Sequence, residues 1–99
     1  MAFNLWGEKE KNTKDKTAVA IKYDPGDTAP KIIATGKGAV AEKIIEKGQE
    51  ENIPFYKDDQ LADTLSRLEI GDMIPPELYE VVAEILVFVS DMDKIRQKL

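Results

Sequence analysis

The chain has 99 residues, of which 42% are hydrophobic and 33% are charged, with a formal net charge of −5 and neither cysteine nor histidine. This length fits one compact domain, and the acidic balance argues against non-specific binding to nucleic acid or to an anionic membrane. Because thiolates and imidazoles are absent, catalysis would fall to carboxylates, lysines and hydroxyls, and we expect no enzyme activity, no metal and no cofactor.

Residues 1–16 begin with an apolar cluster and continue into a run of mixed charges that has no apolar periodicity. We predict that this segment is a flexible N-terminal tail. Its apolar residues, Phe3, Leu5 and Trp6, have three interpretations: a short docking motif, disorder, or incidental packing on the domain.

Two strands are expected next, and the folded domain is expected to begin at residue 17. In residues 18–23, Val19, Ile21 and Tyr23 alternate onto one face, as in a half-buried strand. A segment rich in turn-forming residues then leads to residues 31–35, which predict a second, antiparallel strand.

Residues 39–49 predict a helix, because apolar residues recur there at the spacing of one buried stripe. A short strand over residues 52–57 follows. A strand–helix–strand unit of this length implies a right-handed parallel crossover. The residues of the buried stripe are Val40, Ala41, Ile44 and Ile45.

Two more helices are predicted after this strand. The second helix starts at a cap, Asp58 or Asp59, and lies before Gly71, which can adopt the positive φ that ends helices. The third helix runs from Pro76, which suits a first helical position, to about Met92. The apolar face of the second helix comprises Leu61, Ala62, Leu65 and Leu68.

The third helix contains the most apolar run of the chain, residues 81–89, which is broken by Glu84. It is far shorter than the ~20 residues that a membrane helix needs, so we predict a soluble protein with no membrane span. The run covers more than the arc that a surface helix buries, which predicts leftover apolar surface. Residues 93–99 are expected to be a fraying helical end.

The elements together predict an α/β fold. The sheet is expected to be small and mixed, with about three strands, or four if the N-terminal segment supplies one. Three or four helices pack on it.

Several short segments, in a fixed order, carry a family resemblance. They are Ala18 to Asp24, Ala29 to Ala34, Ile53-Pro54, Leu61-Ala62, Glu69 to Pro75, Leu78-Tyr79 and Val82 to Leu86. They closely resemble the cytoplasmic domain of the FlhB and YscU type, the substrate-specificity switch of flagellar and type III protein export. The resemblance covers residues 17–92. It implies a protein-interaction module of the export apparatus, located in the cytoplasm, with peripheral attachment at the membrane-bound export gate left open.

Two departures from the family pattern shape the functional hypothesis. Family members carry membrane helices before this domain, whereas this sequence has a short polar segment there, so it looks like a stand-alone homologue. The family's self-cleavage sequence, Asn-Pro-Thr-His, is replaced here by Thr13, Lys14, Asp15 and Lys16. That cleavage resembles asparagine cyclisation, helped by a strained turn. Because no asparagine of this chain precedes a proline, we predict that it does not cut itself.

The resemblance also implies a shallow apolar patch that docks export substrates or apparatus components. By residue matching, this patch comprises Ala29, Pro30, Ala83 and Leu86. An alternative of equal weight is that the two helix residues belong to the core and the other two to an ordinary turn. The expected partners are export-substrate peptides or export-apparatus proteins, with no nucleic acid, and we expect a monomer.

A different class of function stays open on the same scaffold, because fold does not fix function. The chain would then be a small ligand-binding regulator or enzyme unrelated to export, with Asp24 and Asp27 as candidate carboxylates.

Two further motifs favour structural interpretations. Residues 35–38, Thr-Gly-Lys-Gly, stand at a helix start, where free N–H groups attract phosphate, but they lack the spacing of a phosphate-binding loop. Asp58, Asp59 and Asp63 invite a metal-site interpretation, yet capping and a solvated helix position explain them more simply.

Overall fold

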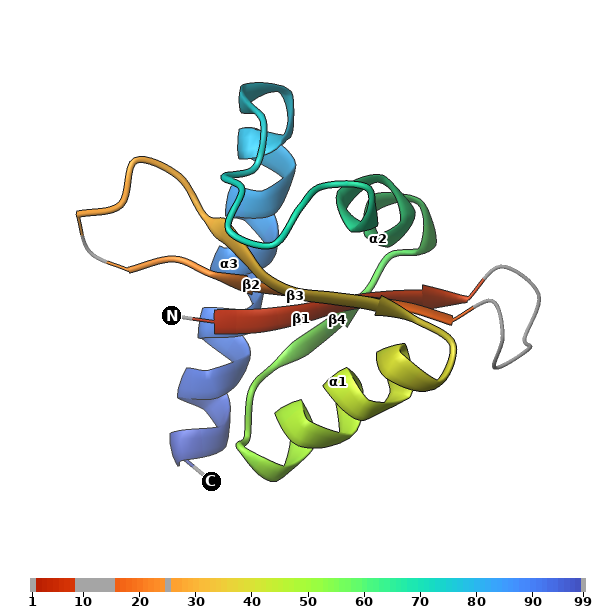
Figure 1. Ribbon diagram of the computed structural model, residues 1–99. Coiled ribbons are helices and arrows are strands. Elements are labelled where there is room, and N and C mark those ends of the chain that lie inside the picture. The colour runs from red at the N-terminus through yellow and green to blue at the C-terminus, as the bar shows by residue number, and fades with distance from the viewer. Residues whose placement is uncertain (1, 9–15, 25, 99) are drawn as a thin grey trace.

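The computed structural model describes residues 2–8, 16–24 and 26–98, with side chains described as far as residue 89. Its strands form one mixed sheet in the order β3-β2-β1-β4 (Figure 1). Strand β1 pairs antiparallel with β2 and parallel with β4, and β2 pairs antiparallel with β3. The predicted α/β class with a small mixed sheet is therefore confirmed. The strands are β1 (Ala2–Glu8), β2 (Lys16–Lys22), β3 (Lys31–Lys37) and β4 (Phe55–Lys57).

Strand β1 shows that the predicted tail over residues 1–16 was wrong for its first half. Ala2–Glu8 pairs along its whole length with β2 and also with β4, so it lies in the interior of the sheet. Phe3 and Leu5 are 1% and 0% exposed and belong to the hydrophobic core. Burial of this size outweighs the weak strand propensity of the segment. Residues 9–15 of the predicted tail lie outside the described residues.

The helices cover both faces of the sheet. Helix α1 (Ala39–Glu50) lies on one face, and α2 (Asp59–Ser66) lies on the other (Figure 1). Helix α3 (Tyr79–Lys98) follows a short 3₁₀ turn, η2 (Pro76–Leu78), and runs past the strands. The core cluster is on the α2 side, where side chains of α3 join those of α2, β1 and β2. The α3 members of this cluster are Val82, Ile85 and Val89.

The helix starts follow local chemistry. Asp58 caps α2, because its Oδ1 accepts a hydrogen bond from the Leu61 N–H at 3.0 Å. Helix α2 ends at Ser66, and Gly71 adopts its positive φ of 96° in the turn that follows. Helix α3 extends beyond the predicted end at Met92 and takes in residues 93–98, whose fraying stays a prediction.

The connection from β3 through α1 to β4 joins the two edges of the sheet. Because β1 is antiparallel to β2 and β2 is antiparallel to β3, strands β3 and β4 run in the same direction, as the predicted parallel crossover requires. At the β3 edge, residues 71–74 hold the start of the strand. The Ile32 N–H donates to the Asp72 carbonyl at 2.9 Å, and the Ile74 N–H donates to the Pro30 carbonyl at 3.0 Å.

Candidate functional site

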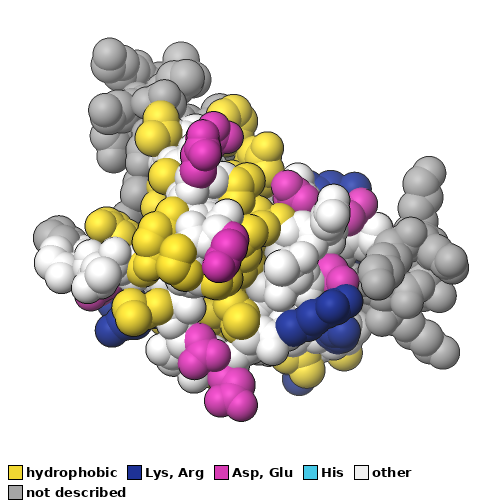
Figure 2. All heavy atoms as spheres, turned by 90° about the horizontal axis from the view of Figure 1, so that it is seen from above, with side chains coloured by type: hydrophobic (Ala, Val, Ile, Leu, Met, Phe, Trp, Pro, Cys, Tyr) yellow, Lys and Arg dark blue, Asp and Glu magenta, His cyan; other side chains and the backbone are white. Residues whose placement is uncertain are grey.

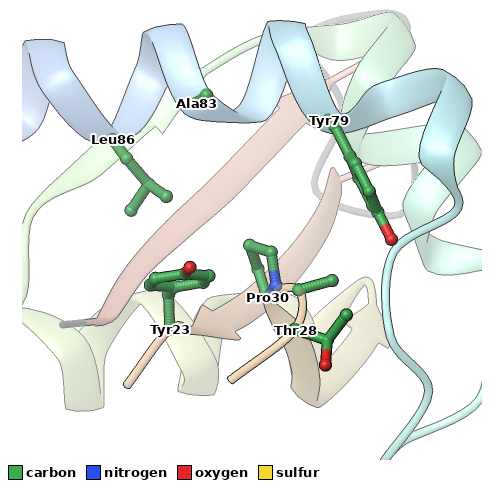
Figure 3. Close-up of a pocket in the computed structure, with 7 residues that line it drawn as sticks. Tyr23, Thr28, Pro30, Tyr79, Ala83 and Leu86 are labelled. Carbon is green, nitrogen blue, oxygen red and sulfur yellow. The ribbon is translucent and has the colours of Figure 1, made fainter. Parts of the chain in front are cut away.

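The residues expected to form the docking patch line one open hollow of about 350 Å³. One wall is α3, and the other is the segment that connects β2 to β3 (Figure 3). The hollow thus brings together residues that lie more than fifty positions apart in the sequence. Its lining residues are Tyr23, Thr28, Ala29, Pro30, Tyr79, Ala83 and Leu86.

Helical spacing builds the α3 wall. Tyr79, Ala83 and Leu86 follow one another at intervals of four and three residues, which places them on one face of the helix. Figure 3 shows the three along the helix, with Leu86 and Tyr79 on either side of Ala83. The small alanine leaves a space between the two larger side chains.

The opposite wall is fixed by hydrogen bonds within its own turn. The Asp24 N–H donates to Asp27 Oδ2, and the Asp27 N–H donates to the Asp24 carbonyl, both at 3.0 Å. The bond from Ile74 to the Pro30 carbonyl anchors the end of the turn. Because the turn is held at both places, Ala29 and Pro30 keep their position opposite α3.

The four predicted residues differ in burial, which separates the two interpretations given above. Ala29 is 1% exposed and is a member of the core, and Pro30 is also buried. Leu86 is partly buried against the core, whereas Ala83 is exposed. The core interpretation therefore fails for Ala83, and this residue is the one through which the hollow can be altered with the least effect on the fold.

Three lining residues escaped the sequence reasoning: Tyr23, Thr28 and Tyr79. The spacing of Tyr79 relative to Ala83 and Leu86 would have found it. Thr28 directly precedes Ala29 in the chain. The strand pattern had assigned Tyr23 to the predicted strand face, whereas in the structure it follows the end of β2. The two tyrosines are about two-fifths exposed, so their hydroxyls add polar groups to a mainly apolar hollow.

The glycine-rich segment before α1 is a strand-to-helix turn. Gly38 has a φ of 59°, which suits glycine, and its N–H donates to the Lys16 carbonyl at 2.8 Å. A side chain at Gly36 would overlap the Val40 side chain. Both glycines thus have structural explanations.

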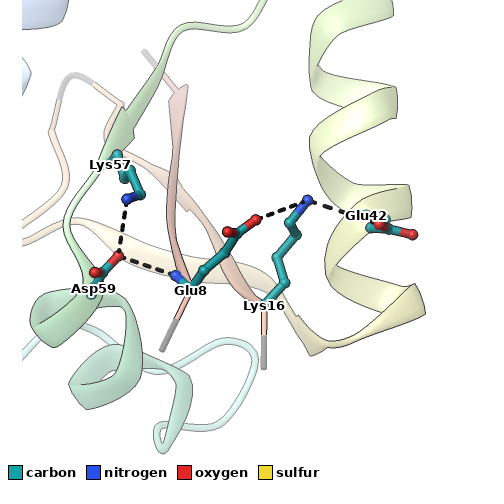
Figure 4. A network of polar contacts seen from close by, with 5 residues as sticks. All are labelled: Glu8, Lys16, Glu42, Lys57 and Asp59. Carbon is teal, nitrogen blue, oxygen red and sulfur yellow. Dashed lines mark hydrogen bonds and ion pairs between the residues drawn. The ribbon is translucent and has the colours of Figure 1, made fainter. Parts of the chain in front are cut away.

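The aspartates considered for a metal site each have another role. Asp58 caps α2, and Asp63 pairs with Arg67 at 3.0 Å. Asp59 Oδ1 accepts the Glu8 N–H at 3.1 Å and lies 3.8 Å from Lys57 Nζ (Figure 4). In the part of the chain that the structure describes, no group of three or more carboxylates could hold a metal ion.

Of the positions that replace the cleavage sequence, Thr13, Lys14 and Asp15 lie outside the described residues. Lys16 starts β2, and its Nζ lies 3.3 Å from Glu8 Oε1 and 3.8 Å from Glu42 Oε1 (Figure 4). The lysine therefore ties the β1–β2 pair to α1.

Trp6, the third member of the N-terminal apolar cluster, has a different environment from Phe3 and Leu5. It is partly buried, and the Nζ atoms of Lys16 and Lys57 lie 5.8 Å and 5.5 Å from its ring centroid. Packing accounts for all three residues of the cluster.

A search of the described helices for a membrane span found none with the length and apolar character that such a span needs.

The fold is that of a class of domain already known from crystal structures. The crystal structure of the cytoplasmic domain of FlhB from Shewanella putrefaciens matches with a TM-score of 0.81 and 28% identity, over 95% of this chain and 74% of that one. A mutated EscU C-terminal domain matches with a TM-score of 0.72 and 28% identity, over 85% of this chain and 81% of that one. The sequence model of the FlhB, HrpN, YscU and SpaS family matches residues 15–89, and the chain belongs to this family.

Sequence relatives differ in how much of their length the chain spans. The protein YlqH of Bacillus subtilis is 41% identical over 86 residues, which are 86% of this chain and 92% of YlqH. The flagellar biosynthetic protein FlhB of Escherichia coli is 41% identical over 87 residues, 86% of this chain but 23% of that protein. FlhB of Aquifex aeolicus is 42% identical over 74 residues, 73% of this chain and 21% of that protein. The chain thus spans less than a quarter of either FlhB protein.

Proposed function

We propose that this chain is a protein-interaction module of a flagellar or type III export apparatus, and that it docks export substrates or apparatus components in the hollow beside α3. The assignment to a flagellar or type III export apparatus is supported by family membership and by the names of the FlhB relatives. The observation that carries the docking role is that Ala29, Pro30, Ala83 and Leu86 line one hollow that is open to solvent.

The chemistry of the hollow suits a short peptide segment. Its volume lies near the lower end of the roughly 300–1,000 Å³ of ligand pockets, which is enough for an apolar side chain but not for a large cofactor. The apolar walls would bury that side chain, and the Tyr79 hydroxyl offers a partner to the peptide backbone. A contact of this size gives weak, transient binding, as a transport intermediate requires.

The proposal includes no catalysis and no self-cleavage. Both carboxylates considered for a ligand-binding regulator or enzyme already have local partners: Asp27 Oδ2 accepts the Asp24 N–H at 3.0 Å, and Asp24 Oδ2 lies 3.4 Å from Lys22 Nζ. We therefore propose no second function. The protein would work in the cytoplasm as a monomer, either free or attached to the export gate at the membrane.

The test replaces Ala83, the exposed residue of the hollow, by a charged one. Ala83→Glu is expected to weaken binding of a fluorescently labelled export-signal peptide by at least about tenfold, because a carboxylate would stand unpaired against the apolar anchor. Leu86→Asp should also weaken peptide binding, and it should lower the stability of the fold as well, because Leu86 packs on the core. Fluorescence anisotropy measures the affinity, and thermal unfolding by circular dichroism checks the fold.

Val87→Glu is the matched control, since Val87 lies on the same helix, is 62% exposed and does not line the hollow. This variant should bind the peptide as the parent chain does. Equal binding by the parent chain and the folded Ala83→Glu variant would refute docking in this hollow. A metal or small anion that raises the melting temperature, with no peptide binding, would favour the regulator class instead.

A further inference from the structure

A second hollow, of different chemistry, lies on the other flank of α3 beside the edge strand β4. It has a volume of about 230 Å³. The α3 residues that line this second hollow differ from those that line the docking hollow. The helix therefore separates the two hollows. The second hollow is lined by Tyr56, Asp58, Val81, Glu84, Ile85 and Phe88.

An aromatic pair forms part of this lining. The rings of Tyr56 on β4 and Phe88 on α3 meet edge to face, with 5.6 Å between centroids and an interplanar angle of 77°. Phe88 is nevertheless 52% exposed, so much of its surface is open to a ligand. Aromatic faces attract cations and planar guanidinium groups.

Two carboxylates share the hollow with these rings. Asp58 accepts the Leu61 N–H through Oδ1, and Glu84 is exposed. Among the residues that the structure describes, no lysine or arginine pairs with either of them. The neighbouring Lys57 is directed elsewhere, to Asp59 at 3.8 Å and to the ring of Trp6 at 5.5 Å.

The net charge of the chain also favours a basic ligand. Figure 2 shows hydrophobic side chains gathered on the face seen from above, with Asp and Glu side chains among them and Lys and Arg at the margins. The chain as a whole carries a formal net charge of −5. A basic segment would therefore be attracted to this chain, whereas nucleic acid and anionic lipid would be repelled.

We propose that the second hollow binds an arginine side chain from a basic segment of a partner protein. The aliphatic stem would pack on Val81 and Ile85, the guanidinium plane would lie on the open surface of Phe88, and its N–H groups would donate to Asp58 and Glu84. Arginine fits better than lysine, because an ammonium group neither stacks on a ring nor offers a planar fork to two acceptors.

The test is a nuclear magnetic resonance titration of the ¹⁵N-labelled chain with two pentapeptides. One is acetyl-Gly-Leu-Arg-Leu-Gly-amide, and the other has citrulline, which is neutral and nearly isosteric, in place of arginine. The arginine peptide is expected to shift the amides of Tyr56, Glu84 and Phe88 and to bind more weakly as salt is added. The citrulline peptide should leave these amides in place.

Three substitutions localise the site. Glu84→Gln and Asp58→Asn each remove one charge, and asparagine keeps the cap of α2, so both should weaken the arginine peptide about threefold without unfolding the chain. Phe88→Leu keeps apolar bulk but removes the ring, and it should weaken binding to a similar extent. Glu80→Gln is the matched control, because Glu80 is an exposed acid of α3 that does not line the hollow.

Three results would overturn the proposal: equal shifts with the citrulline peptide, shifts confined to Tyr23 and Tyr79, or equal weakening by Glu80→Gln and Glu84→Gln. The second of these would assign the arginine peptide to the docking hollow. The two hollows are tested with different peptides and different variants. The docking proposal and the arginine-site proposal can therefore be refuted independently of each other.

Discussion

The side-chain amide of Asn4, on β1, lies directly against Gly48, on α1. A Cβ atom at residue 48 would overlap Nδ2 of Asn4. Asn4 is 2% exposed, and its Nδ2 donates to the Ile44 carbonyl at 3.4 Å, so it has little freedom to move aside. Helix α1 can approach the sheet this closely because residue 48 has no side chain.

Gly48→Ala is therefore expected to destabilise the chain, by about 1–2 kcal/mol, even though alanine favours helices more than glycine does. The overlap would push Asn4 from its place or α1 from the sheet. Urea unfolding followed by circular dichroism measures the change. Gln49→Ala, at the exposed neighbouring position, should stay within about 0.5 kcal/mol of the parent chain.

A double-mutant cycle assigns this loss to the contact itself. In an Asn4→Ala background the overlap is gone, so Gly48→Ala should be neutral or should stabilise by up to about 1 kcal/mol through helix propensity. If the two substitutions were instead additive, the cost of Gly48→Ala would have to come from another contact.

The cap of α2 predicts a difference between two substitutions of Asp58. Asp58→Ala removes the acceptor of the Leu61 N–H and should lower the free energy of unfolding by about 1 kcal/mol. Asp58→Asn keeps an acceptor of nearly equal quality, so its cost should be only a few tenths of a kcal/mol. Urea unfolding of both variants decides the matter, and equal losses would show that charge, not capping, is what counts at this position.

Self-cleavage is expected to be absent. The purified chain, kept for several days at neutral pH and then analysed by mass spectrometry in denaturing solvent, should give only the intact mass. The matched variant restores the family sequence through Thr13→Asn, Lys14→Pro, Asp15→Thr and Lys16→His, and it is expected to split after the new asparagine. Fragments of the parent chain that end between residues 12 and 17 would refute the prediction.

The periodic elements could be predicted from sequence because each carries its own pattern. The predicted helix over residues 39–49 is α1, and the strands expected over 18–23 and 31–35 correspond to β2 and β3. Strand β1 was expected only as the alternative in which the N-terminal segment supplies a fourth strand. The tail was preferred because the charged run has no apolar periodicity, and Asn4 and Gly7 are also poor strand residues. Asn4 lies against Gly48, and a side chain at Gly7 would overlap the backbone of Asp59. Only the folded structure shows why these residues stand in a strand.

The docking hollow was partly predictable for a similar reason. Its four expected residues came from the family resemblance, which matches positions but not burial. That Ala29 is a core residue while Ala83 is exposed follows from how α3 lies against the β2–β3 connection. The second hollow depends on Tyr56 meeting Phe88 across more than thirty residues, and no local pattern carries such a contact.

The position of β1 has a consequence for the integrity of the domain. This strand is hydrogen-bonded to neighbours on both sides and inserts Phe3 and Leu5 into the core. A nick in the backbone between residues 8 and 16 would therefore leave two fragments that stay associated and migrate together under native conditions. We therefore expect the cohesion of the domain to come from the pairing and burial of β1 rather than from the continuity of the chain between β1 and β2.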